Sequence, residues 1–262
     1  MVARALWYVK PGGAEIRAER LGPPLPGQAR VQTAFSALSR GTESLVARGE
    51  VPEGEWERMR APLQAGHFPF PVKYGYAAAG VVTDGAEHLL GRRVFALHPH
   101  QDYFLAQDDQ LQIVPDTVPL RRAALAANME TALNAHWDAG TMAGDRILVV
   151  GAGILGLLVA RLARRLAGVD VAITDIDAGK ARFARALDVN FAEPGDAPGN
   201  NRLVFHTSAT SAGLETAIAK AGFEGRIVEL SWWGARAATV SLGGAFHSQR
   251  LQILSSQVGH VA

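Results

Sequence analysis

Three glycines at fixed spacing are the residues of this sequence with the clearest chemical meaning. Gly151, Gly153 and Gly156 form the pattern G-x-G-x-x-G directly after the apolar run Ile147–Val150. A buried strand, such a turn and a helix in succession are typical of a site for the pyrophosphate of a dinucleotide. Gly151 would permit the tight turn, Gly153 would let the pyrophosphate approach the backbone, and Gly156 would let the helix pack closely on the strand.

The helix that this turn opens is expected to supply the phosphate contacts. Its first residues, Ile154 and Leu155, would present free backbone N–H groups and the positive end of the helix dipole to the phosphates.

An acidic residue at the end of the next strand is the second signal. Asp175 follows the apolar run Val171–Thr174, roughly 20 residues beyond the glycines, as the dinucleotide pattern requires. A carboxylate there accepts both hydroxyls of the adenosine ribose and repels a 2′-phosphate, which favours NAD over NADP. Two alternatives stay open: Asp175 could cap a turn, and Asp177 could be the ribose ligand instead.

Other polar residues are weaker candidates. Ser208 and Ser231 end neighbouring strands, where each would either contact the cofactor or cap the following turn. The segment His98-Pro99-His100 invites a metal interpretation, but no acid or third histidine stands at suitable spacing. A role in a loop or a substrate pocket is therefore favoured.

Composition excludes several classes of protein. The formal net charge is +1 and the basic residues are scattered, so neither nucleic acid nor a membrane surface is expected as a partner. Cysteine is absent, which rules out disulfides and thiolate ligands and fits a cytoplasmic protein. The N-terminal segment alternates like a strand and lacks the apolar core of a signal peptide.

The hydrophobic period changes along the chain, and this predicts two domains. Residues 1–117 are rich in turn signals and short alternating runs, which indicates a mostly antiparallel β domain. A helix-like, charged stretch over residues 43–60 interrupts these strands. In residues 118–262 a helical segment over residues 120–140 precedes alternating strands and helices, which indicates a doubly wound α/β domain with a parallel sheet.

These features together resemble the medium-chain dehydrogenase/reductase family, the alcohol dehydrogenases with a GroES-like first domain and a Rossmann domain. The segment Ser39-Arg40-Gly41-Thr42-Glu43 is similar to the family's catalytic loop, and Tyr74–Gly80 to its Gly-His-Glu-x-x-Gly segment. The spacing of Asp175 and Lys180 matches the NAD-selecting acid and a following lysine. A narrower resemblance, on short motifs, points to the branch that contains bacteriochlorophyllide hydroxyethyl dehydrogenase. The rival class, a methyltransferase, is disfavoured by the third glycine and the preceding β domain.

The departures from the family concern zinc. The resemblance places the three catalytic zinc ligands at Ser39 or Arg40, at Tyr76, and at Ala126 or Ala127, none of which is a usable ligand. The cysteine-rich lobe for structural zinc is missing as well. We therefore expect no zinc.

Without zinc, a side chain must exchange the proton of the substrate oxygen. The resemblance places Tyr76 at a ligand position as hydrogen-bond donor, with Thr42 and Glu130 as relay candidates. Each also has a structural interpretation: Tyr76 as a core aromatic, Thr42 as a helix cap, and Glu130 as a solvated helix residue. Arg40 would contact the cofactor pyrophosphate under the ungapped alignment and lie on the surface otherwise.

Two classes of function remain at this stage. The first is a zinc-independent, NAD-dependent oxidoreductase acting on a hydroxyl or carbonyl of a small molecule. The second is a dinucleotide-binding protein without catalysis, acting as a sensor or structural partner. The sequence ends soon after the expected sixth strand, Leu251–Ser255, where the family usually continues. An uncovered sheet edge there predicts a homodimer.

Overall fold

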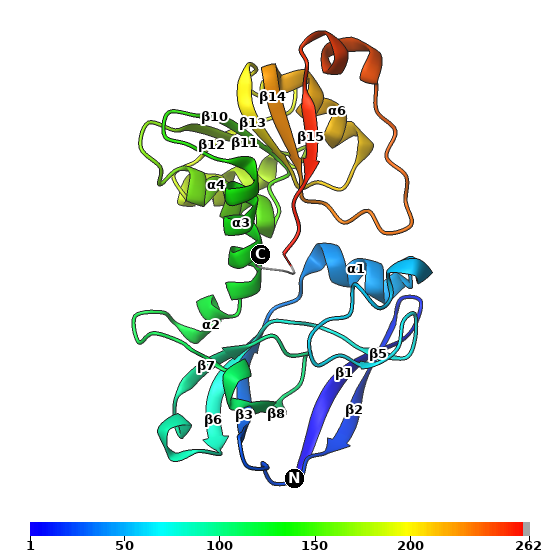
Figure 1. Ribbon diagram of the computed structural model, residues 1–262, viewed down its shortest axis with the longest axis vertical. Helices are drawn as coiled ribbons and strands as arrows, with labels where there is room; N and C mark the ends of the chain where they lie inside the picture. Colours follow the sequence, from blue (N-terminus) through cyan, green and yellow to red (C-terminus); the bar gives the residue numbers. More distant parts are fainter. Residues whose placement is uncertain (259–262) are drawn as a thin grey trace. The chain divides into compact units, whose positions relative to one another are not determined.

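The computed structural model describes residues 1–258, which form two compact units (Figure 1). Unit 1 comprises Met1–Ala127, and unit 2 begins at Asn128. Each unit is described by itself.

Unit 1 is built from two antiparallel sheets. The first sheet has the strand order β2-β1-β5-β4 and the second has the order β8-β3-β6-β7-β9. Their strands are β1 (Val2–Lys10), β2 (Gly13–Arg20), β3 (Gln28–Ser36), β4 (Ala65–Gly66), β5 (Val72–Lys73), β6 (Ala78–Asp84), β7 (Arg93–Ala96), β8 (Tyr103–Gln107) and β9 (Gln112–Ile113). Alternate residues of the second sheet, among them Val31, Val94 and Phe104, are fully buried and form its core. The antiparallel β character predicted for this half is confirmed.

In unit 1, one strand was missed and one local prediction was wrong. The strand β2, which forms a hairpin with β1, was not foreseen, because its segment carries charged residues and only one large apolar one. The predicted helix over residues 43–60 is instead the nine-residue α1 (Arg40–Arg48) followed by a 3₁₀ turn, η1 (Glu53–Glu55). Gly49 ends α1 in the left-handed conformation, with φ 72°, and this conformation is typical of a helix C-terminus.

Unit 2 contains a six-stranded parallel sheet with the order β12-β11-β10-β13-β14-β15. This is the order 3-2-1-4-5-6 of dinucleotide-binding sheets, with the switch point between β10 and β13. The strands are β10 (Arg146–Val150), β11 (Asp170–Thr174), β12 (Asn190–Ala192), β13 (Asn201–His206), β14 (Ala221–Glu229) and β15 (Gln252–Ser255). The doubly wound parallel sheet is therefore confirmed, although β12 was not predicted.

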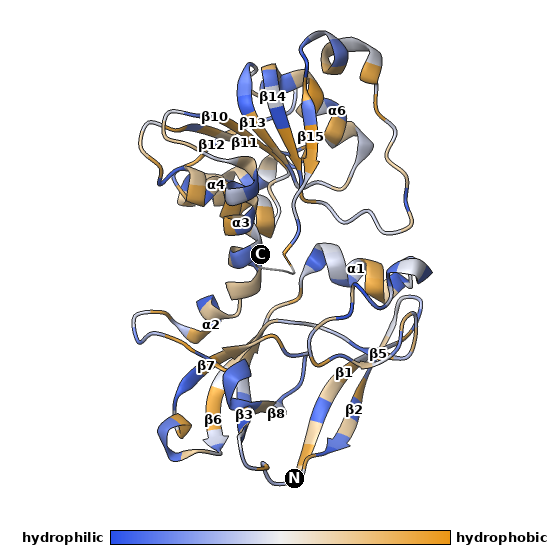
Figure 2. Cartoon of the chain, in the orientation of Figure 1, coloured by the Kyte–Doolittle hydropathy of each residue, from blue (hydrophilic) through white to orange (hydrophobic). Residues whose placement is uncertain are grey.

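Helices cover both faces of this sheet because its strands bury side chains on both sides. Ile147 and Val149 of β10 pack in the cluster that contains α3 and α4, whereas Leu148 and Val150 pack in the cluster that contains α6. Figure 2 shows that β13 begins with hydrophilic residues and continues with hydrophobic ones. The α-helices that follow the sheets of unit 1 are α2 (Leu120–Ala123), α3 (Ala126–Ala139), α4 (Ile154–Ala163), α5 (Ala181–Ala186) and α6 (Ser211–Lys220). A π-helix, η5 (Leu242–Phe246), precedes β15.

The helical segment predicted over residues 120–140 is thus two helices, α2 and α3, rather than one. Gly140 follows α3 with φ 59°, as expected of a stop signal. Within residues 1–258, none of the helices combines the length and the apolar character needed to cross a bilayer.

Candidate dinucleotide site and hydroxyl cluster

The turn between β10 and α4 has the geometry that the three glycines predict. Gly151 adopts φ 108°, a conformation that side chains rarely allow. A Cβ on Gly156 would lie 1.9 Å from the carbonyl oxygen of Gly151, so only glycine lets the helix approach the strand here. A Cβ on Gly153 would have no chain atom within 4 Å. The backbone at Gly153 therefore faces open space, which fits a dinucleotide pyrophosphate.

The start of α4 supplies donors to the same space. Gly153 is the N-cap, and the first intrahelical hydrogen bond runs from Leu157 N to Gly153 O over 2.9 Å. The backbone N–H groups of Ile154 and Leu155 precede this bond and lie in the first turn, where a helix lacks acceptors of its own. This arrangement favours an anionic ligand.

Asp175 lies directly after β11 and reaches back toward this turn. Its Oδ2 accepts hydrogen bonds from Ala152 N and Lys180 Nζ, each over 2.8 Å, and its Oδ1 accepts one from Asp177 N over 3.0 Å. Burial alone would raise the pKa of Asp175, but the hydrogen bonds from Lys180 and the two backbone N–H groups hold it below its usual value. Asp177 is occupied differently, because its side chain accepts from Gly179 N at the start of the 3₁₀ turn η4 (Ala178–Lys180). Of the two acids, Asp175 is the one that contacts the glycine turn, through Ala152 N, and the ribose ligand stays a prediction.

A second candidate site, in unit 1, gathers hydroxyl groups around Tyr76. This tyrosine lies between β5 and β6, and the hydroxyl groups of Ser39 and Thr42, at the start of α1, are near enough to its side chain to lower its pKa. Burial raises the pKa of Tyr76 above its ordinary value, and the two nearby hydroxyls offset part of this effect. The phenol therefore stays protonated at neutral pH, as a hydrogen-bond donor must. The structure thus brings Tyr76 and Thr42 together.

A buried carboxylate holds this part of α1 in place. Glu43 is 3% exposed, and its Oε1 accepts a hydrogen bond from Ser39 N over 2.7 Å. Its Oε2 accepts one from Tyr8 Oη over 2.9 Å and lies 2.7 Å from His100 Nε2. The other ring nitrogen of His100, Nδ1, is hydrogen-bonded to Ser36 Oγ. Sequence reasoning assigned no role to Glu43 or Ser36. For the segment His98–His100 it predicted a role in a loop or a substrate pocket, and of its two histidines only His100 belongs to this network.

His98 has a different environment from its neighbour. It stacks on Phe104 with ring centroids 3.9 Å apart, and its Nδ1 lies 2.8 Å from the carbonyl oxygen of Pro99. Burial lowers the pKa of His98 to about 4. It is a neutral core residue.

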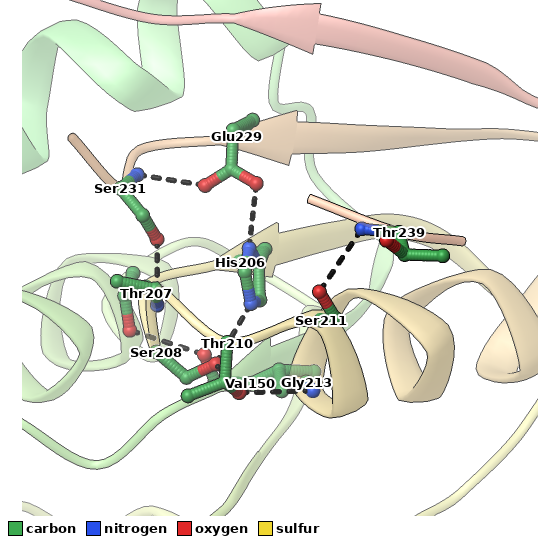
Figure 3. A network of polar contacts seen from close by, with 11 residues as sticks. Val150, His206, Thr207, Ser208, Thr210, Ser211, Gly213, Glu229, Ser231 and Thr239 are labelled. Atoms are coloured by element: carbon green, nitrogen blue, oxygen red, sulfur yellow. Dashed lines mark hydrogen bonds and ion pairs between the residues drawn. The ribbon is translucent and has the colours of Figure 1, made fainter. Parts of the chain in front are cut away.

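The remaining predicted residues lie as follows. Arg40 is exposed in the first turn of α1, and Glu130 is exposed on α3 in unit 2. Ser208 and Ser231 follow β13 and β14 and join a hydrogen-bonded network that includes His206 and Glu229, two residues that sequence reasoning did not single out (Figure 3). The sequence could have indicated this pair, because His206 ends β13 and Glu229 ends the neighbouring strand β14.

The residues present do not fit zinc. Among residues 1–258, no group of three or more histidines, cysteines, aspartates and glutamates is arranged to hold a metal ion. At the positions where the resemblance puts zinc ligands, Tyr76 carries a phenol whose pKa is raised by burial, and Ala127 offers no donor side chain.

Comparison with known proteins gives the fold its context. No protein-family model matches the chain. D-xylulose reductase A of Aspergillus niger is 27% identical over 149 residues, which are 53% of this chain and 41% of that protein. L-arabinitol 4-dehydrogenase of Talaromyces emersonii is 41% identical over 64 residues, which are 24% of this chain and 16% of that protein. The chain thus spans less than half the length of the curated relatives it matches.

Solved structures match over a larger share of the chain. L-idonate 5-dehydrogenase of Escherichia coli superposes with a TM-score of 0.81 at 12% identity, covering 98% of this chain and 83% of that one. Acetophenone reductase of Geotrichum candidum in complex with NAD superposes with a TM-score of 0.76 at 17% identity, covering 97% and 82%. The chain has the alcohol dehydrogenase-like fold, and up to about half of its sequence is similar to D-xylulose reductases and sorbitol dehydrogenases.

Proposed function

We propose that this protein is an NAD-dependent oxidoreductase that acts on a hydroxyl or carbonyl group of a small molecule without zinc. The observation that carries the proposal is the turn from Gly151 to Gly156, which leaves open space at Gly153 beside a helix start, with Asp175 after the next strand. The named activities of the relatives, the reduction of xylulose and the dehydrogenation of arabinitol and sorbitol, support an alcohol or polyol as substrate.

In the proposed reaction the cofactor handles the hydride and side chains of the protein handle the proton. Bound NAD supplies the acceptor or donor of the hydride. Tyr76 donates a hydrogen bond to the substrate oxygen and exchanges its proton there, and Thr42 passes the proton on. The supporting observation is that the buried phenol of Tyr76 lies beside the hydroxyls of Ser39 and Thr42, which act on its pKa. Glu130 is a further relay candidate, and Arg40 a candidate for the cofactor pyrophosphate.

The cofactor preference rests on Asp175 and Lys180. A carboxylate that already accepts three hydrogen bonds is held in its ionised form and would repel a 2′-phosphate. NAD is therefore preferred over NADP.

The oligomeric state and the branch of the dehydrogenase family are also part of the proposal. The strand β15 lies at one edge of the parallel sheet, and edge pairing between two copies would give a homodimer in the cytoplasm. Light scattering that returns a monomeric mass would contradict this. The motifs shared with the branch of bacteriochlorophyllide hydroxyethyl dehydrogenase support the reaction class, hydride transfer at a hydroxyl or carbonyl group.

A titration with NADH and NADPH, followed by nicotinamide fluorescence and by metal analysis of the same sample, tests the proposal. We expect tighter binding of NADH, no stoichiometric zinc, and turnover with polyols or ketones that falls about 100-fold or more in Tyr76→Phe. Tighter binding of NADPH would overturn the role of Asp175. Binding of NADH without any turnover would favour the alternative, a catalytically inactive sensor.

Two glycine variants provide a matched control. Gly153→Ala should abolish NADH binding and leave the free energy of unfolding nearly unchanged, because its Cβ meets no atom of the chain. Gly156→Ala should weaken NADH binding and also lower the free energy of unfolding, because its Cβ would overlap the Gly151 carbonyl. Normal NADH binding by Gly153→Ala would place the pyrophosphate elsewhere.

A further inference from the structure

A cavity of about 260 Å³ lies in unit 1, and no residue of the glycine turn or of the hydroxyl cluster around Tyr76 lines it. Its lining comes from three stretches of the chain, which are the turn before β4 (Pro62, Leu63), the end of β7 with the residue after it (Phe95, Ala96, Leu97), and the segment of β9 and the 3₁₀ turn η3, Asp108–Gln110 (Asp109, Gln110, Gln112). The volume is slightly below the roughly 300–1,000 Å³ of sites for drug-sized ligands, so the cavity suits a smaller molecule.

The apolar part of the lining is accessible to a ligand. Leu63 and Leu97 are 38% and 37% exposed, whereas Phe95 and Ala96 are buried. A ligand in the cavity would cover the two leucines and remove apolar surface from water, which is favourable. The lining therefore favours a ligand with an apolar body.

The wall that carries Leu63 is fixed by hydrogen bonds. Leu63 has φ 57°, a left-handed conformation that is unusual for a residue with a branched side chain. The next residue holds this turn, because Gln64 Oε1 accepts a hydrogen bond from Ala61 N over 3.1 Å and Gln64 O accepts one from Arg60 Nη2 over 3.2 Å. Such strained residues cluster at ligand sites. Because the wall exists before a ligand binds, little conformational entropy is lost on binding.

The polar part of the lining carries negative charge. Gln110 is engaged, since its Oε1 accepts a hydrogen bond from Gln107 N over 3.0 Å and so fixes η3. In the part of the chain that the structure describes, no hydrogen bond or ion pair engages the side chains of Asp109 and Gln112. Asp108 adds a second carboxylate to the same turn, and the described lining residues include no lysine, arginine or histidine. Coulomb attraction therefore favours a cation here and disfavours an anion.

We propose that this cavity binds a small primary amine with an apolar body, whose ammonium group pairs with Asp109. The apolar body covers Leu63 and Leu97. A neutral molecule of the same shape gains only the apolar contacts, and an acid of the same shape is repelled.

Three ligands with the same phenyl group and nearly the same length test this assignment on the full chain. They are 2-phenylethylamine, which is positive, phenylacetamide, which is neutral, and phenylacetate, which is negative. Titrations followed by the backbone amide NMR signals give both the affinity and the location of binding. We expect the amine to bind about threefold to fivefold more tightly than the amide, as an exposed ion pair predicts, and the acid to bind more weakly than the amide. The signals of Leu63, Leu97 and Gln112 should shift. Equal affinities, or shifts confined to residues outside the lining, would overturn the proposal.

Three variants separate the charge of Asp109 from the shape of the cavity. Asp109→Asn should remove the preference for the amine and leave the affinity for phenylacetamide within twofold of the wild type. Glu87→Gln is the matched control, because it removes an exposed acid of unit 1 that does not line the cavity, and the preference should stay at the wild-type value. Leu97→Ala should weaken the amine and the amide alike, about threefold or more. A preference that persists in Asp109→Asn, or that disappears in Glu87→Gln, would overturn the role of Asp109, and unchanged affinities in Leu97→Ala would place the ligand elsewhere.

Discussion

Each unit holds a glutamate, a histidine and a serine in hydrogen-bonded series, but the two series pass through the imidazole in opposite directions. In unit 1, Glu43 faces His100 Nε2 and Ser36 faces Nδ1. In unit 2, the acid faces Nδ1 of His206 and the serine faces Nε2. The same three residue types thus meet in both units, but the acid faces a different imidazole nitrogen in each.

Burial separates the two series further. In unit 1 the acid is the most enclosed member, at 3% exposed, and the serine is exposed. In unit 2 the imidazole is the enclosed member and the acid is only half-buried. The carboxylate of Glu43 gathers three partners inside unit 1, so that series mainly holds the fold, whereas the series of unit 2 presents a hydroxyl at the sheet edge.

Removal of the buried acid should have the largest effect on stability. Glu43→Ala leaves Tyr8 Oη, Ser39 N and His100 Nε2 without their acceptor. At about 1–3 kcal/mol for each unsatisfied buried group, we expect a loss of about 4 kcal/mol in the free energy of unfolding, measured with urea. A loss under about 1 kcal/mol would show that unit 1 does not depend on this network.

A histidine without an acid partner should respond to pH. Because burial lowers the pKa of His98 to about 4, only the unfolded chain binds a proton there between pH 6.5 and 4. Stability contributed by His98 is therefore lost as the pH falls through this window, by about 1.4 kcal/mol per pH unit.

Urea unfolding at several pH values tests this, with His98→Asn as the variant that keeps a donor near the Pro99 carbonyl. In the variant, the free energy of unfolding should fall less steeply between pH 6.5 and 4, because the contribution of His98 is missing. Equal slopes in the two proteins would mean that His98 is protonated in the folded chain.

The acid of unit 2 should matter less for stability than that of unit 1. Glu229→Gln keeps an acceptor for His206 but sets an amide group against Ser231 N. We expect a loss of about 1–2 kcal/mol on thermal or urea unfolding. A loss as large as that of Glu43→Ala would remove the contrast between the two series.

The smallest effect should come from the exposed end of the unit 1 series. Ser36→Ala removes a hydroxyl that water can replace, so the free energy of unfolding should fall by less than about 1 kcal/mol. A larger loss would make Ser36 a structural member of the network.

The contrast also shows what the sequence can predict. The series of unit 2 was within reach, because parallel strands end at one sheet edge and a histidine and a glutamate end neighbouring strands there. The glycine turn and the Asp175–Lys180 ion pair, with 2.8 Å between Lys180 Nζ and Asp175 Oδ2, follow the same local logic. The series of unit 1 joins residues 36, 43 and 100, whose meeting depends on the antiparallel pairing of β3 with β8 and on the helix α1 that follows β3.

The errors have a similar origin. The end of α1 depends on Gly49, whose left-handed conformation outweighs the helical charge pattern that continues to residue 60. The strand β2 forms because β1 supplies its hydrogen bonds, and its own side chains carry little of the alternating pattern. A single glycine decided the first case, and pairing with the neighbouring strand decided the second.

The open space at Gly153 separates folding from function at one position. An alanine there meets no atom of the folded chain, so nothing in the stability of the protein selects against it. A library sorted by expression level or melting temperature would retain that substitution and would enrich proteins that fold normally and bind no cofactor. Position 153 should therefore be sorted by ligand binding, whereas position 156 can be sorted by either property.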